Sequence, residues 1–141
     1  MEQKIEPLSD EDAHHVERQR TWVRGYPLEE HARHNYETIE GKLRLLQNIL
    51  DAGWIEPTEK WMLQSLGICL GDALAQKLGL NWIAVEDDFG RTPSLEVPGS
   101  TLILFPLTAI SKRIERGEKV DVSELFDGFC EMVAEKRSQG Y

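Results

Sequence analysis

Leucines spaced three and four residues apart predict a buried helix in the middle of the chain, over residues 58–78. The leucines that define its inner face are Leu63, Leu66, Leu70 and Leu74. The Pro-Thr pair at its start can open the helix, and Gly79 can end it in the left-handed conformation. Gly67 and Gly71 lie four residues apart on an adjacent line, and each costs roughly 1 kcal/mol relative to alanine. We therefore expect another element to pack closely against this helix.

Apolar positions at helical spacing predict four further helices. Their expected ranges are residues 10–24, residues 28 or 36 to 52, residues 106–116 and residues 121–133. Ser9 with Asp12 resembles a capping box at the start of the first, and Asp121 with Glu124 repeats this pattern at the last. The segment after the last helix is polar and is expected to fray.

Between residues 80 and 105 the pattern changes to that of strands. The expected strands are residues 80–86, 94–97 and 101–105. The turns between them are short, so we predict an antiparallel meander, because a parallel pair needs a longer crossover. The third strand is almost continuously apolar, which favours a central place in the sheet.

The order of elements indicates the α+β class: N-terminal helices, a three-stranded antiparallel meander, and two C-terminal helices packed on one face of the sheet. A chain of 141 residues fits one domain. We place that domain at residues 9–136, after a flexible N-terminus at residues 1–8 and before a frayed tail at residues 137–141.

The formal net charge of −9 narrows the choice of partner. It disfavours nucleic acid and anionic membranes, because both attract basic surfaces, and it is compatible with a basic protein partner.

The sequence has neither a secretory signal nor an apolar run long enough to span a membrane, so we expect a cytoplasmic protein. The oligomeric state stays open. Cys69 and Cys130 are interpreted as reduced thiols, although a disulfide between them stays open.

Asp72 is the first candidate for chemistry, because it follows Gly71 within the central helix. If its side chain points inward it needs a partner, since an unpaired buried carboxylate is costly. Arg91 or Arg113 could supply that partner. A structural ion pair is the favoured interpretation.

An acidic group at the end of the first strand is the second candidate: Glu86, Asp87 and Asp88 could hold a divalent cation or supply an acid–base pair. A turn capped by aspartates is favoured, because the alternating ligands of a calcium loop are missing. Two weaker candidates are a groove lined by Trp61, Trp82 and Phe89, and a metal site formed by Glu30, His31 and His34. Core packing and a solvated polar face, respectively, explain these residues better.

Motifs of common enzyme classes are missing from the sequence. The serines lie in no nucleophile elbow, and there is neither a phosphate loop nor a dinucleotide fingerprint. We therefore predict a protein that is not an enzyme, with no catalytic residue, no bound metal and no cofactor.

Three segments carry a family resemblance: LGICLGDAL in the central helix, GLNWIAVEDDFGRTPSL in the predicted hairpin, and FPLTAISKRIERGEKVDVSELF after it. Together, from Leu66 to Phe126, they resemble the bacterial family called domain of unknown function 3806, and the family-like part extends over about residues 58–134. The resemblance implies a small intracellular bacterial α+β domain. It implies no established activity, substrate or catalytic residue.

Two hypotheses of function remain. The first is a non-catalytic protein-binding or regulatory module, including the special case of an immunity protein that neutralises a basic toxin. The second is a small-ligand-binding protein or enzyme with a pocket between sheet and helices. The candidate ligand- or partner-binding residues are Asp72, Trp82, Asp87, Asp88, Arg91 and Arg113.

Overall fold

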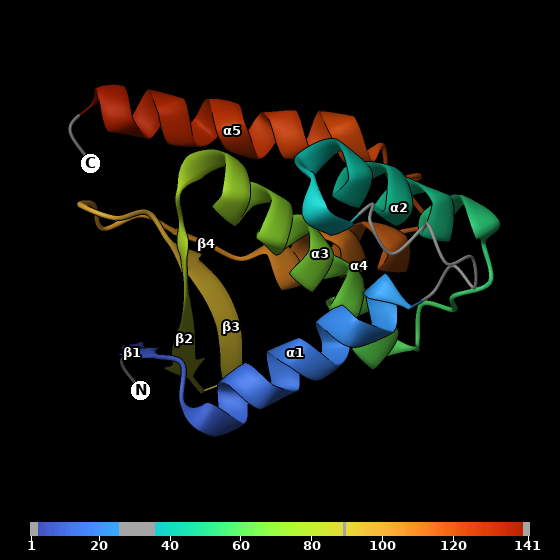
Figure 1. The fold of residues 1–141 in the computed structure, drawn as a ribbon, viewed down its shortest axis with the longest axis horizontal. Coiled ribbons are helices and arrows are strands. Elements are labelled where there is room, and N and C mark those ends of the chain that lie inside the picture. The colour runs from blue at the N-terminus through green and yellow to red at the C-terminus, as the bar shows by residue number, and fades with distance from the viewer. Residues whose placement is uncertain (1–2, 26–35, 89, 140–141) are drawn as a thin grey trace.

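A computed structural model describes residues 3–25, 36–88 and 90–139 of the chain, and its central element is the helix α3 (Lys60–Leu78). Figure 1 shows α3 between α1 (Asp10–Arg24) and α5 (Val122–Ser138), and it contacts α2 (Ile39–Ala52) and α4 (Pro106–Glu115) as well. Ten of its nineteen residues are buried, which confirms the predicted central helix. The helix begins two residues later than expected, and Gly79 ends it with a φ of 69° as predicted.

The two helical glycines of α3 allow α4 and β2 to approach closely. A Cβ atom built on Gly67 would lie 2.4 Å from the Cα of Leu107, in the first turn of α4. A Cβ atom on Gly71 would lie 2.4 Å from the ring of Trp82. The close approach expected from the sequence is therefore confirmed.

Caps fix the starts of the flanking helices. The amide of Asp12 donates to the Ser9 hydroxyl at 3.0 Å, and the Ser9 amide donates to the Asp12 carboxylate at 2.9 Å, so the capping box of α1 is confirmed. Asp121 accepts from the amide of Glu124 at the start of α5. The tail expected to fray, residues 137–141, is helical as far as Ser138, because α5 continues to that residue and Arg137 donates to the carbonyl of Leu78 at 3.1 Å.

The sheet has four antiparallel strands in the order β1-β2-β3-β4: β1 is Lys4–Pro7, β2 is Asn81–Asp87, β3 is Gly90–Glu96 and β4 is Ile103–Leu104. The α+β class is confirmed, but the sheet gains β1 from the N-terminal segment, where we expected no regular structure. The third predicted strand is also not central. It shrinks to two residues at the edge, because Pro106 begins α4 directly after Phe105.

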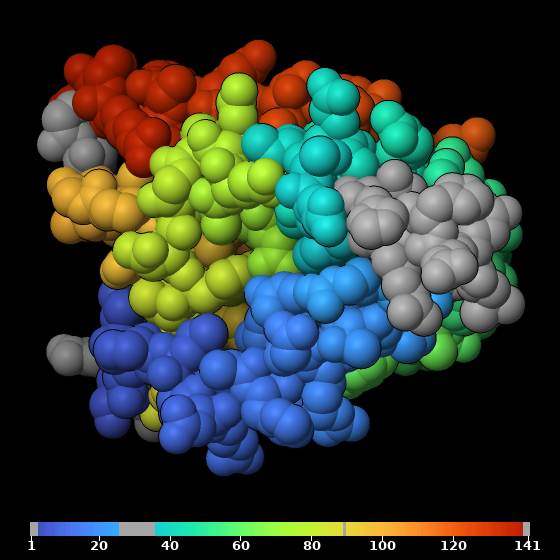
Figure 2. Space-filling model, viewed as in Figure 1, coloured from blue at the N-terminus to red at the C-terminus, as the bar shows by residue number. Residues whose placement is uncertain are grey.

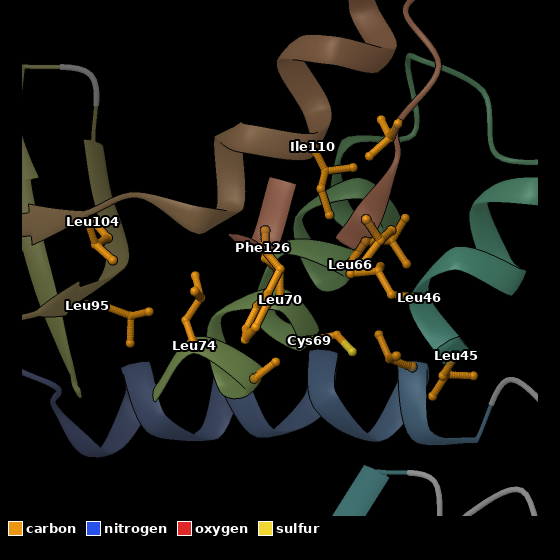
Figure 3. Close-up of a cluster of buried hydrophobic side chains, with 14 of the residues drawn as sticks. Leu45, Leu46, Leu66, Cys69, Leu70, Leu74, Leu95, Leu104, Ile110 and Phe126 are labelled. Atoms are coloured by element: carbon orange, nitrogen blue, oxygen red, sulfur yellow. The ribbon is translucent and has the colours of Figure 1, made fainter. Parts of the chain in front are cut away.

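The core forms where α3 meets the sheet and the other helices. Figure 3 shows leucines of α3 converging with side chains of α2, β3, β4, α4 and α5: Leu45, Leu46, Leu66, Leu70, Leu74, Leu95, Leu104, Ile110 and Phe126. None of the helices that the structure describes combines the length and apolar character needed to cross a lipid bilayer.

Candidate functional site

Asp72 holds together a polar network between α3, α1 and β2. Arg20 donates to both carboxylate oxygens, from Nε to Oδ2 at 2.7 Å and from Nη2 to Oδ1 at 2.9 Å. The hydroxyl of Tyr36 donates to Oδ2, and the indole Nε1 of Trp82 donates to Oδ1 at 3.0 Å. Four hydrogen bonds therefore stabilise this carboxylate, which confirms that it is paired. They also bring together two of the candidate residues from the sequence, Asp72 and Trp82.

The arginine of this Asp72 network is Arg20, so the expected partners Arg91 and Arg113 were wrong. Arg20 lies four residues after the buried Val16 and three before the buried Val23. This spacing places Arg20 on the inward face of α1. The sequence therefore contained a signal for the pairing, although α1 has few apolar positions to reveal which face is inward.

Burial controls the titration of the groups around this network. It raises the pKa of Tyr36 well above its ordinary value, raises the pKa of the Cys69 thiol to about 12, and lowers the pKa of Lys42. The Lys42 ammonium donates to Gln76 Oε1 at 2.6 Å. At neutral pH the phenol and the thiol stay protonated, so neither is an activated nucleophile.

Arg91 forms a second network that ties β1 and α1 to β3. Its Nη2 donates to Oδ2 of Asp12 at 2.8 Å and its Nε donates to Oδ1 at 3.1 Å, while its Nη1 lies 3.3 Å from Glu6 Oε1 and 3.9 Å from Glu86 Oε1. The hydrogen bonds from Arg91 lower the pKa of Asp12 to about 2. These contacts explain Arg91 as a structural residue.

The acidic turn does not gather a metal site among the described residues. Asp87 ends β2 and Asp88 follows it in the hairpin turn. Within residues 3–25, 36–88 and 90–139, no three His, Cys, Asp or Glu side chains are placed to hold a metal ion. Four residues of the weaker hypotheses lie outside the described residues: Glu30, His31, His34 and Phe89.

The tryptophans of the expected groove are separated from one another. Trp82 lies over Gly71 and is partly buried. Trp61 stands edge-to-face with Trp22, with ring centroids 5.9 Å apart, and Trp54 contacts Trp22 in the same way at 6.2 Å. Packing at the boundary of the core therefore accounts for these rings.

The remaining candidate, Arg113, lines a surface hollow of about 490 Å³, which we call the α5 groove. Its lining residues come from α4, from the loop at residues 118–121 and from α5: Arg113, Glu118, Lys119, Val120, Asp121, Glu124, Leu125, Gly128, Phe129 and Met132. Three of these side chains, Leu125, Phe129 and Met132, are half-buried and pack against the core, so the floor of the groove is apolar. Charged groups of both signs form its rim.

Gln47 of α2 fixes the loop that walls the α5 groove. Its amide Nε2 donates to the Val120 carbonyl at 3.1 Å, and its Oε1 accepts from the Val122 amide at 2.8 Å. The other side of the loop lines a second hollow of about 820 Å³, which reaches Gly53 at the end of α2. Neither Gln47 nor these hollows were foreseen, because the sequence pattern describes each helix but not the gaps between them.

An acidic stripe runs along the exposed face of α5. It consists of Glu124, Asp127, Glu131 and Glu135, which lie three or four residues apart and so share one face of the helix. Within the described residues, no lysine or arginine forms a salt bridge with Asp127 or Glu131. Figure 2 shows α5 along the upper rim of the molecule, with α1 at the opposite edge.

These observations define an α+β protein in which two ion-paired networks join separate elements of the fold and a groove with an acidic flank lies on the surface. The chain belongs to the family described as domain of unknown function (DUF3806), whose profile matches residues 42–126. The resemblance inferred from the sequence is thereby confirmed. A comparison with curated proteins finds no match.

A crystal structure of a protein from Bacteroides thetaiotaomicron VPI-5482 has a similar fold, with a TM-score of 0.74 and 17% sequence identity. The similarity covers 94% of this chain and 48% of that one, so the present chain spans about half the length of its structural relative. At this identity the likeness concerns the fold alone.

Proposed function

We propose that this protein is a non-catalytic protein-binding module and that the α5 groove is its binding surface. One observation carries the proposal: the groove combines an apolar floor with a charged rim, as the core and rim of protein interfaces do. Leu125, Phe129 and Met132 keep part of their surface exposed, and a partner that covered them would gain hydrophobic free energy.

The polar networks favour binding over catalysis. The carboxylates of Asp72 and Asp12 are each held by an arginine through two or more hydrogen bonds, so their oxygens are already engaged in pairs that stabilise the fold. Within the described part of the chain, Asp72, Asp87 and Asp88 line none of the hollows reported above. The alternative of a ligand pocket between sheet and helices therefore gains no support from these residues.

A finer form of the proposal is an immunity-type protein that neutralises a basic toxin. The net charge of −9 would accelerate encounter with a basic protein, and the acidic stripe beside the groove would orient it. A cytoplasmic location in a bacterium is part of this proposal.

Gly128 offers a clean test, because it lines the groove and a Cβ atom there meets no other atom within 4 Å. Gly128→Tyr should fill the groove without disturbing the core, whereas Gly128→Ala should leave it open. Tagged forms of both variants and of the natural protein are used to capture partners from lysate of the source cells, with quantitative mass spectrometry. We expect a stoichiometric protein partner that the natural chain and Gly128→Ala retain and Gly128→Tyr loses. A partner retained equally by Gly128→Tyr would exclude the groove as the binding surface.

A further inference from the structure

Resting on the proposed function of the α5 groove, we infer that the groove takes a basic amphipathic helix from the partner protein. The backbone around the groove explains why a helix fits better than an extended strand. Residues 122–138 are helical, so most of their backbone groups are already bonded within α5. In the wall of the groove, the Val120 carbonyl and the Val122 amide are bonded to Gln47.

An extended peptide gains affinity by pairing its main chain with a free strand edge. The α5 groove offers side chains instead of such an edge, and a helix satisfies its own backbone before it binds. The positions of Leu125, Phe129 and Met132, spaced by four and three residues, suit the ridge of apolar side chains on a second helix. Gly128 between them lets the two helices approach closely.

The size of the groove sets the length of the bound helix. Along α5 it extends from Asp121 to Met132, which corresponds to roughly 16 Å at 1.5 Å per residue. About three helical turns of the partner would therefore contact the floor.

The charges beside the groove determine which sign of charge the bound helix should carry. The stripe residues Asp127 and Glu131 have no salt-bridge partner among the described residues, whereas Asp72, Asp12 and Glu17 each have one. Lysine or arginine on one flank of the bound helix would supply the missing partners. Arg113 and Lys119, on α4 and the loop, would face the opposite flank and favour an acidic residue there.

The probe is a synthetic 14-residue peptide with leucine at helical spacing and lysine at the other positions. Two matched peptides carry glutamate in place of lysine, or the same composition in an order without an apolar face. Binding is measured by fluorescence anisotropy and located by 1H–15N chemical shifts. We expect the basic amphipathic peptide to bind and shift residues 118–132, and the two matched peptides to bind at least about tenfold more weakly.

Variants of the protein separate groove from charge. Gly128→Tyr should lower the affinity for the basic peptide by about tenfold or more, whereas Gly128→Ala should leave that affinity unchanged. The double variant with Asp127→Lys and Glu131→Lys should bind the basic peptide about fivefold more weakly at low salt, and the difference should be smaller at high salt. The pair Glu11→Lys and Glu56→Lys changes the net charge equally on exposed sites outside the groove and should have a smaller effect.

The outcomes distinguish this inference from the proposed function. If the basic peptide fails to bind while capture of a natural partner still depends on Gly128, the groove is the binding surface and its occupant is not a basic helix. Equal binding of the acidic or scrambled peptide would also overturn the inference. If the peptide binds Gly128→Tyr as tightly as it binds the natural protein, the α5 groove is not its site. If the two double-lysine variants lose the same amount of peptide affinity, the peptide is attracted by the net charge of the protein and not by the acidic stripe.

Discussion

Substituting alanine for Gly67 tests the closest packing in the fold, that of α3 against the first turn of α4. The added methyl group would lie 2.4 Å from the Cα of Leu107, 2.9 Å from the carbonyl oxygen of Pro106 and 3.1 Å from the Leu107 amide nitrogen. Carbon atoms in good contact lie about 3.5 to 4.0 Å apart, so the backbone of α4 must retreat by roughly 1 Å. No rotation of a side chain can relieve this contact, because all three neighbouring atoms belong to the backbone.

Two opposing effects set the magnitude. Alanine is favoured over glycine inside a helix by about 1 kcal/mol. Overpacking a core costs typically about 1 to 3 kcal/mol, and a backbone contact belongs at the upper end of that range. We therefore expect Gly67→Ala to lower the free energy of unfolding by about 2 kcal/mol.

Gly128→Ala is the matched control, because it makes the same substitution inside a helix where the methyl group meets nothing within 4 Å. It should raise the free energy of unfolding by about 1 kcal/mol. Urea denaturation monitored by circular dichroism measures both variants, which should differ by about 3 kcal/mol with similar slopes against urea. If Gly67→Ala were as stable as Gly128→Ala, α3 and α4 could not pack as described.

Three further predictions concern the ion pairs and the loop. Asp72→Asn should lower the free energy of unfolding by about 3 kcal/mol, because Arg20 loses its partly buried carboxylate partner and keeps only the exposed Glu17, and a loss below about 1 kcal/mol in urea denaturation would contradict this. Gln47→Glu loses the amide donor that holds the loop, so the loop amides should exchange hydrogen faster by NMR, and unchanged exchange would mean that other contacts hold it. The pKa of Asp12 is about 2 beside Arg91, against an ordinary 3.8, so the stability that its ionised form contributes is present above about pH 4 and is lost as the pH falls toward 2. The difference in unfolding free energy between Asp12→Asn and the natural protein should shrink across that range, and a difference independent of pH would refute the pairing.

The helices could be predicted from the sequence because the features that define a helix lie within a few residues of one another. The leucine spacing of α3, the capping box of α1 and the glycine after α3 each depend on neighbours in sequence. The pair Gly67 and Gly71 even predicted close packing, since two costly glycines in one helix need a compensating contact. The partners in that contact, Leu107 and Trp82, could not be read from the same pattern.

The errors concern contacts between distant segments. The strand β1 has four residues and pairs with β2 about eighty positions later, so its short alternation carries no information about its partner. The apolar run at residues 101–105 resembles a central strand, but apolar side chains also suit a short edge segment that packs on α3. Arg20 lies 52 positions before Asp72. The loop that walls the α5 groove is bonded to Gln47, which lies 73 positions before Val120.

The acidic stripe of α5 leads to a last prediction, in which stability and binding change in opposite directions. Asp127, Glu131 and Glu135 are spaced by four residues, and like charges at this spacing destabilise a helix by a few tenths of a kcal/mol for each pair. Glu131→Lys replaces two repulsive pairs with two attractive ones, so it should raise the free energy of unfolding by about 0.5 to 1 kcal/mol. The same change should lower the affinity for the basic amphipathic peptide. Urea denaturation measures the change in stability and fluorescence anisotropy measures the change in affinity, both on one preparation of the variant. A gain in stability with undiminished binding would show that the stripe does not serve recognition, whereas opposite changes would explain why a helix carries charges that its own fold does not favour.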